Sequence, residues 1–168
     1  MAEGEFALVR QHLEMALPKT GLPPGNAAPG ADHDLYAMLA DACALQRDEA
    51  AIRQYAPLAE EAAAQCGHQL YLGIAHRAWG VAHCLAGEFA ESQARLQKAL
   101  DIFQSLDTRW QLGRTLFELG DLARAQKDLA GARDHFTRAL AAFTEMEAAP
   151  DAARARVRLD SLGKGESQ

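Results

Sequence analysis

A stretch of sequence recurs after an interval of 40 residues, and this interval limits the possible folds more than any other feature. Residues 88–103 read EFAESQARLQKALDIF, and residues 128–143 read DLAGARDHFTRALAAF. The segments before them keep the same interval, because Trp79-Gly80 is answered by Leu119-Gly120. A fixed period of this length is typical of stacked structural repeats. The chain is therefore expected to be an array of similar units.

The repeats are predicted to be helical. From Asp32 onward the sequence is rich in Ala, Leu, Gln, Glu and Arg, and no run of Val, Ile or Thr alternates with polar residues. Acidic residues that can cap a following helix stand at Arg47-Asp48, Gly87-Glu88 and Lys127-Asp128. Helices are predicted near residues 5–17, 33–46, 49–65, 68–86, 89–105, 109–126, 129–146 and 151–162.

The length of 168 residues, 49% of them hydrophobic, fits one domain with a real core. Residues 18–31 contain four prolines, so they are predicted to form a loop. We divide the single domain, residues 1–168, into a half repeat at 4–17, the loop at 18–31, helical hairpins at 32–66, 67–106 and 107–147, a capping helix at 150–163 and a tail at 164–168.

Small residues recur at two positions of each hairpin, where they would let paired helices approach closely. On the first helix they are Ala40, Gly80 and Gly120, and on the second helix they are Ala59, Ala99 and Ala139. Large apolar residues accompany them, among them Leu39, Trp79, Leu119, Phe89, Leu96, Phe136 and Phe143. Small residues therefore admit the neighbouring helix, and large residues fill the space beside it.

At these positions the chain resembles the tetratricopeptide repeat family. The matching residues are Leu119-Gly120 on the first helix, Gly87 in the turn, Phe89 at the entry to the second helix, and Ala132, Phe136, Ala139 and Leu140 along it. The resemblance implies an all-α, right-handed solenoid of antiparallel helical hairpins that binds other proteins. The 40-residue period exceeds the family's usual ~34 and is similar to extended repeats of bacterial signalling proteins and of large transcription activators. In the earliest repeat Pro57 predicts a kink.

Composition argues against several classes of function. The net charge is −6 and no basic run is present, so neither nucleic acid nor a membrane is an expected partner. The sequence has no signal peptide and no apolar segment near the ~20 residues that span a bilayer, which predicts a cytoplasmic protein. Cys43, Cys66 and Cys84 are expected to be free thiols.

Candidate catalytic and metal-binding residues are few. His76, His83 and Cys84 lie close together, but no pair has the spacing that presents two metal ligands side by side. His76 and His83 also fall where the family carries packing residues. No nucleophile elbow, phosphate-binding loop or HExxH motif is present. We expect a protein that is not an enzyme, with no catalytic residues, metal or cofactor.

The resemblance implies that the first helices of successive hairpins line a concave groove for a protein or peptide partner. The residues on that side are Asp34, Asp41, Ile74, Arg77, Val81, Arg114, Phe117, Asp121, Arg124, Arg154 and Arg158. We expect the arginines and Phe117 to be exposed there and to hold an extended segment with an apolar anchor and an acidic end. The alternative is an effector-sensing regulatory domain of a larger bacterial signalling protein or transcription activator, which would need a closed pocket.

The first predicted helix lacks the mate that a second helix of a repeat normally has. Phe6, Val9, Leu13 and Leu17 are expected to face the next hairpin, and some apolar surface should remain uncovered. The loop could cover it, a second copy could do so in a homo-oligomer, or the missing helix could lie upstream in a longer chain. We favour the last two, because the loop offers only Leu22 as a large apolar residue.

Overall fold

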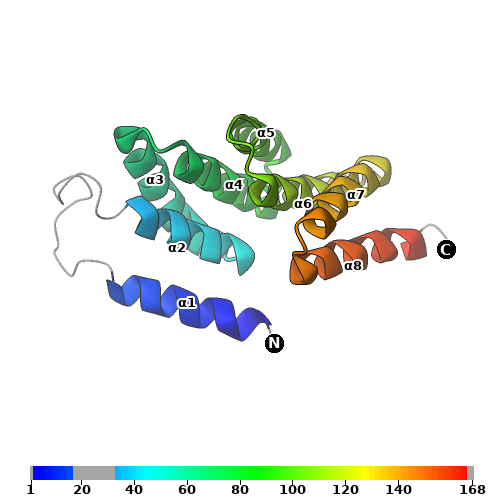
Figure 1. The fold of residues 1–168 in the computed structure, drawn as a ribbon, viewed down its shortest axis with the longest axis horizontal. Coiled ribbons are helices and arrows are strands. Elements are labelled where there is room, and N and C mark those ends of the chain that lie inside the picture. The colour runs from blue at the N-terminus through cyan, green and yellow to red at the C-terminus, as the bar shows by residue number, and fades with distance from the viewer. Residues whose placement is uncertain (1, 17–32, 166–168) are drawn as a thin grey trace.

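The structure is a computed structural model that describes residues 2–16 and 33–165 (Figure 1). These residues form eight helices and no strand, which confirms the all-α prediction. The helices are α1 (Ala2–Ala16), α2 (His33–Leu45), α3 (Glu49–Cys66), α4 (Gln69–Leu85), α5 (Phe89–Ser105), α6 (Arg109–Ala125), α7 (Leu129–Glu145) and α8 (Ala149–Gly165). The predicted loop at 18–31 lies outside the described residues.

Consecutive helices pack against one another along the whole array, as in a solenoid of antiparallel hairpins. The hairpins are α2–α3, α4–α5 and α6–α7, while α1 packs on α2 and α8 packs on α7. Figure 1 shows α4 and α6 across the middle of the molecule, with α2 and α8 below them on the left and right, α1 beneath α2, and α5 at the top. The first helices α2, α4 and α6 also contact one another from one hairpin to the next.

Six turns with the same geometry set the period. In each turn one residue has a left-handed backbone, and these residues are Arg47, Gly67, Gly87, Asp107, Lys127 and Glu147, at intervals of 20 residues. At Arg47, for example, its own N–H donates to the Ala44 carbonyl at 3.1 Å and the Asp48 N–H donates to the Cys43 carbonyl at 3.1 Å. These two bonds define a Schellman motif, which satisfies the last carbonyls of a helix.

The acids after these turns cap the next helix in two of the three predicted cases. Asp48 accepts a hydrogen bond from the Ala51 N–H at 3.0 Å, and Asp128 accepts one from the Gly131 N–H at 2.9 Å. Glu88 makes no side-chain cap. Its longer side chain instead accepts from Arg53 at 3.0 Å, on the neighbouring hairpin.

The core is built from small residues on one helix facing large residues on its partner. A Cβ atom placed on Gly120 would lie 2.6 Å from the ring of Phe136, and one on Gly80 would lie 2.5 Å from Leu96. The alanines Ala59, Ala99 and Ala139 are completely buried. Close approach of the helices at these positions therefore requires the small residues that the repeat supplies.

Helix α3 differs from the later second helices in that it contains a proline, Pro57, and it continues through that residue without a break. Among the α1 side chains that the structure describes, only Leu13 packs against the core, whereas Val9 is 44% exposed, so the expectation that Val9 faces the next hairpin is wrong. Arg10 explains the placement, because its guanidinium donates to Asp48 at 2.6 Å and turns that side of α1 toward the turn after α2. The side chains of Phe6 and Leu17 lie outside those described.

Within the described part of the chain, no helix combines the length and the apolar character needed to cross a membrane.

Candidate functional site

The candidate site is the inner face, which we define as the side of α2, α4, α6 and α8 where polar residues of different hairpins meet. Repeat spacing places Asp41, Arg77 and Arg114 on that side of three successive first helices. The structure brings these three side chains into direct contact. The predicted register of the inner face therefore corresponds to a real cluster of charged groups.

Asp41 is held by two arginines at once. Both terminal nitrogens of Arg114 donate to its carboxylate, at 2.7 and 2.9 Å, and one nitrogen of Arg77 donates at 2.9 Å. The other terminal nitrogen of Arg77 donates to the side-chain oxygen of Gln111 at 2.5 Å. The two-point contact from Arg114 is the geometry with which guanidinium groups bind carboxylates most strongly.

Burial makes this cluster electrostatically strong. The Arg77 side chain is only 2% exposed, and that of Asp41 is 20% exposed. Burial on its own would raise the pKa of Asp41, but the charges of Arg114 and Arg77 outweigh it and lower that pKa to about 2. Burial, and then the charge of Arg114, lower the pKa of Arg77 to about 10. All three groups are therefore ionised near neutral pH.

A second cluster lies beside the end of α2. Arg47, in the turn after α2, donates to Glu118 and to Asp121 on α6, each at 2.6 Å. Arg158 of α8 donates to Asp121 at 2.9 Å, and Arg124 lies 3.5 Å from the same carboxylate. The charge of Glu118 has the largest effect on the pKa of Arg47 and raises it. Burial lowers this pKa and the charge of Asp121 raises it, so that the net effect is an increase. Asp121 thus joins α2, α6 and α8.

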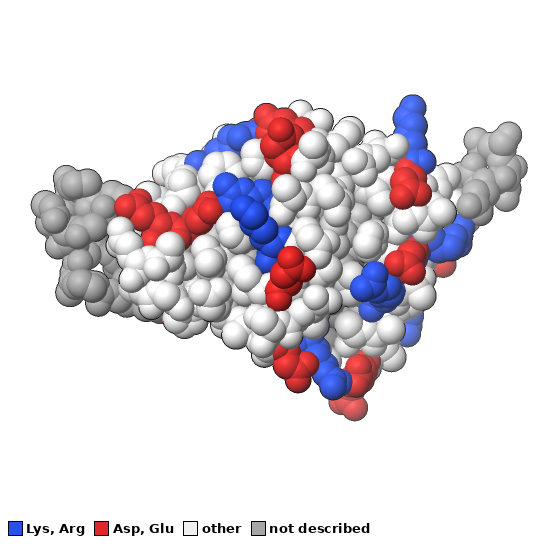
Figure 2. All heavy atoms as spheres, turned by 90° about the horizontal axis from the view of Figure 1, so that it is seen from above, with Lys and Arg blue, Asp and Glu red and all other residues white. Residues whose placement is uncertain are grey.

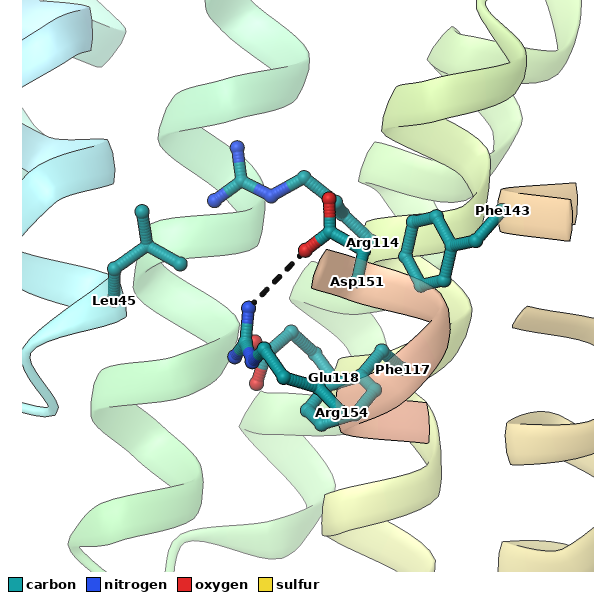
Figure 3. A pocket seen from close by; sticks show the side chains of 7 residues that line it. All are labelled: Leu45, Arg114, Phe117, Glu118, Phe143, Asp151 and Arg154. Carbon is teal, nitrogen blue, oxygen red and sulfur yellow. Dashed lines mark hydrogen bonds and ion pairs between the residues drawn. The ribbon is translucent and has the colours of Figure 1, made fainter. Parts of the chain in front are cut away.

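Aromatic rings support the arginines between α6 and α8. The guanidinium of Arg154 lies 4.9 Å from the centre of the Phe117 ring, and that of Arg158 lies 5.7 Å from it. Figure 3 shows Arg154 beside Phe117, with a contact to Asp151 at 3.3 Å. Arg114 stacks in the same way on Trp110, at 4.8 Å. Such cation–π contacts hold a guanidinium in place while leaving its N–H groups available.

Two hollows adjoin these residues. The one in Figure 3 has a volume of about 10 Å³ and is lined by Leu45, Arg114, Phe117, Glu118, Phe143, Asp151 and Arg154. That volume is at the lower limit for a single water molecule. The other is an open cleft of about 270 Å³ along α8, lined by Phe117, Ala153, Arg154, Val157 and Arg158. Space for a partner therefore exists at the α8 end of the inner face.

The remaining predicted residues are distributed differently. Ile74 and Val81 are 8% and 1% exposed and belong to the core, while Asp34 is exposed at the start of α2, where it accepts from the Leu35 N–H at 2.8 Å. The expectation that all the groove arginines are exposed is wrong for Arg77 and Arg114, which are buried. Their long side chains turn onto Asp41 instead of pointing into solvent.

Phe117 is also buried, with 4% of its surface exposed, because Arg154 and Arg158 lie over its ring. Sequence reasoning also missed Arg47, Gln111 and Glu118. Arg47 occupies the position of the turn glycine. Nothing in the sequence around it indicates that its side chain reaches Glu118, which lies 71 residues later in another hairpin. Gln111 and Glu118 could have been found only by extending the inner register to their neighbouring positions on α6.

Cys43 and His76 are buried and Cys84 is partly buried, whereas Cys66 is exposed. Burial raises the pKa of Cys43 to about 11 and also raises the pKa of Cys84, so both are protonated near neutral pH. His76 is 7% exposed and lies 2.9 Å from Arg95. Burial lowers the pKa of His76. Among the described residues no group of three or more His, Cys, Asp or Glu is arranged to hold a metal ion.

The opposite side of the molecule has a different character. Figure 2 views the molecule from above, the side on which α5 lies, and shows acidic and basic residues interspersed among uncharged ones. Neither sign forms a continuous patch on that side.

Comparison with known proteins supports the repeat architecture. Residues 71–145 match a family model described as tetratricopeptide repeat. Nineteen chains of solved structures match the chain. One is a crystal structure of BtubC (BKLC) from P. vanneervenii, with 18% identity and a TM-score of 0.62 over 99% of this chain and 75% of that chain. At this identity the likeness concerns the fold alone. Among curated proteins none matches the sequence.

Proposed function

We propose that this chain, whose residues 71–145 are tetratricopeptide repeats, is a non-enzymatic scaffold that binds an acidic segment of a partner protein on its inner face. Repeats of this family generally mediate contacts between proteins. The proposal takes its binding residues from the predicted groove set without the core residues Ile74 and Val81, and it assigns the first contact to those that solvent reaches. These are Arg124, Arg154 and Arg158, whose side chains are 47%, 44% and 37% exposed.

The observation that carries the proposal is the excess of arginine over carboxylate within the two ion-pair clusters of the inner face. The two ion-pair clusters contain Arg47, Arg77, Arg114, Arg124 and Arg158 against Asp41, Glu118 and Asp121. The whole chain has a net charge of −6, so this local excess is opposite to the overall balance. A surface with unbalanced positive charge attracts and orients an acidic segment.

The cleft along α8 adds an apolar element to this recognition. Val157 is 63% exposed and lies at the cleft between Arg154 and Arg158. An apolar side chain of the partner would cover Val157, and its flanking carboxylates would meet the two arginines. The partner chemistry that fits is therefore an extended segment in which apolar and acidic residues are interspersed.

Cavity size favours this proposal over the sensing of a small effector. Pockets that enclose small molecules usually have about 300–1,000 Å³. The hollow beside Arg114 has about 10 Å³, and the cleft of about 270 Å³ is open to solvent. A single anchoring side chain suits such a cleft better than a whole effector molecule does.

The test uses a short capped peptide of alternating glutamate and leucine, labelled with a fluorophore and titrated by anisotropy. The combined variant Arg154→Gln and Arg158→Gln should bind at least about tenfold more weakly, because a hydrogen bond to a charged group contributes about 1.5–3 kcal/mol. Circular dichroism checks that the variant keeps its helices.

The matched control removes two arginines elsewhere. Arg109→Gln with Arg138→Gln makes the same change in charge at side chains that are 54% and 51% exposed on other surfaces. Its affinity should equal that of the unchanged protein. Equal binding by the Arg154 and Arg158 variant, or equal binding of a peptide with lysine in place of glutamate, would rule the proposal out.

We also propose that the chain self-associates through α1. Leu8 and Met15 are 56% and 61% exposed, and they stand seven residues apart on one side of the helix, beside Val9. Apolar side chains grouped in this way are typical of a protein interface. Covering them with a second copy would remove the apolar surface from water.

A further inference from the structure

Helix α2 is joined to α6, which belongs to the next hairpin but one. Asp41 reaches Arg114 across 73 residues of sequence, and Arg47 reaches Glu118 across 71. In helical-repeat arrays each repeat normally contacts only its neighbours. These two contacts and the ion pair between Arg47 and Asp121 are called the α2–α6 ion pairs below. They close the inner face over α4, where Arg77 lies.

The hydrogen bonds between α2 and α6 are ion pairs, although Ala37 of α2 also belongs to a small apolar cluster against which Leu112 of α6 packs. The core cluster of α2, α3 and α4 contains Leu39, Cys43 and Ile52, and the largest cluster is formed by residues of α5 to α8 such as Phe136. No buried residue of α2 belongs to that largest cluster. Separation of α2 from α6 would therefore break the ion pairs while leaving the largest apolar cluster intact, which favours a reversible opening.

Asp41 sits on its two arginines as a bound carboxylate would. Arg77 and Arg114 are 2% and 7% exposed, whereas 20% of the Asp41 side chain is exposed. The carboxylate is thus the outermost member of the cluster and covers the guanidinium groups from solvent. The N–H groups that Asp41 engages are those that a carboxylate of a partner would use.

We propose that Arg77 and Arg114 form an anion-binding site that Asp41 occupies in the free protein, and that an acidic segment of a partner takes the place of Asp41 and separates α2 from α6. The inference rests on the proposed function, since it describes how the same inner face is regulated. Arg154 and Arg158 make the first contact, and the buried pair becomes available as α2 moves. Asp41 accordingly acts as an internal competitor of the partner.

The experiment compares the glutamate–leucine peptide with the unchanged protein, Asp41→Asn and Asp101→Asn. Asp41→Asn removes the competing charge and should bind the peptide at least about tenfold more tightly, which corresponds to one charge-assisted contact. Asp101→Asn makes the same change in net charge on α5, where Asp101 is exposed and accepts only from Gln97 at 2.7 Å. Its affinity should equal that of the unchanged protein.

A second measurement covers the case in which Asp41→Asn does not fold, because it leaves two buried cations without a counter-ion. Small-angle scattering of the unchanged protein should give a larger radius of gyration when the peptide is saturating. An unchanged radius of gyration, or an affinity of Asp41→Asn for the peptide within about twofold of that of the unchanged protein, overturns the proposal that Asp41 is an internal competitor. Either result leaves the proposed function intact. If the peptide binds none of the variants, the proposed function fails as well.

Discussion

At the scale of single residues, the glycines of the first helices set the distance between paired helices. Gly120 faces the ring of Phe136, and Gly80, forty residues earlier, faces Leu96. Any side chain at these positions would occupy space that the partner residue already fills. The glycine recurs in the sequence because the two helices cannot otherwise approach as closely.

Gly120→Ala should therefore destabilise the protein. The added methyl group would lie 2.6 Å from Phe136, and overpacking of this kind typically costs about 1–3 kcal/mol. Gly163→Ala is the matched control, because its Cβ meets nothing within 4 Å and alanine is the better helix former by about 1 kcal/mol. Urea denaturation should show a loss of stability for the first and a small gain for the second. Equal stabilities would contradict this account of the packing.

The identity of the residue at the left-handed position did not reveal that the turns share one geometry. Glycine occupies the left-handed position at Gly67 and Gly87, but Arg47, Lys127 and Glu147 adopt the same backbone. A left-handed backbone costs a non-glycine residue about 1–2 kcal/mol, which the paired hydrogen bonds of each turn and the packing of the helices offset. The left-handed geometry that the six turns share was thus hidden, although the breaks between helices were predicted.

At the scale of helices, the sequence was sufficient to predict the individual helices but not the contacts between helices of distant hairpins. Breaks such as Lys127-Asp128 predicted the helix ends to within a few residues, and Ala59, Ala99 and Ala139 predicted the close packing. The register also placed Asp41 and Arg114 on one side. Their mutual contact depends on how strongly the array curves, which is the sum of small rotations between hairpins and leaves no local pattern in the sequence.

The contact between α2 and α6 should make stability depend on pH. Burial alone would raise the pKa of Asp41, but Arg114 and Arg77 hold it at about 2 in the folded protein, compared with ~3.9 in an unfolded chain. A carboxyl group with a lowered pKa stabilises the folded state above the unfolded value, and this stabilisation disappears as the pH falls toward 2. Asp41 should contribute about 2 kcal/mol that is lost between roughly pH 4 and pH 2.

Denaturant titrations between about pH 5 and pH 2 measure this contribution. Asp41→Asn should lose less stability over that interval than the unchanged protein, since its side chain does not titrate. Asp101→Asn should follow the unchanged protein. Parallel pH profiles for Asp41→Asn and the unchanged protein would show that this carboxyl group is not the source of the dependence.

At the scale of the whole molecule, the exposed apolar side chains of α1 predict association. Covering a few hundred Å² of such surface would contribute several kcal/mol at roughly 25 cal/mol per Å². Sedimentation velocity should show a larger species as the protein concentration rises, and Leu8→Gln with Met15→Gln should shift it toward the monomer. Leu85→Gln with Leu106→Gln is the control, at residues 43% and 39% exposed in other turns. A monomer at every concentration would exclude this interface.

The ion pairs between α2 and α6 also bear on how the array unfolds. In an array with nearest-neighbour contacts alone, a terminal hairpin can fray while the rest stays folded. Here loss of the α2–α3 hairpin would also break the ion pairs of Asp41 with Arg77 and Arg114, and of Arg47 with Glu118. Charge-assisted hydrogen bonds of this kind are stronger than neutral ones. Fraying at one end would therefore weaken the third hairpin, and the repeats would melt as one cooperative unit.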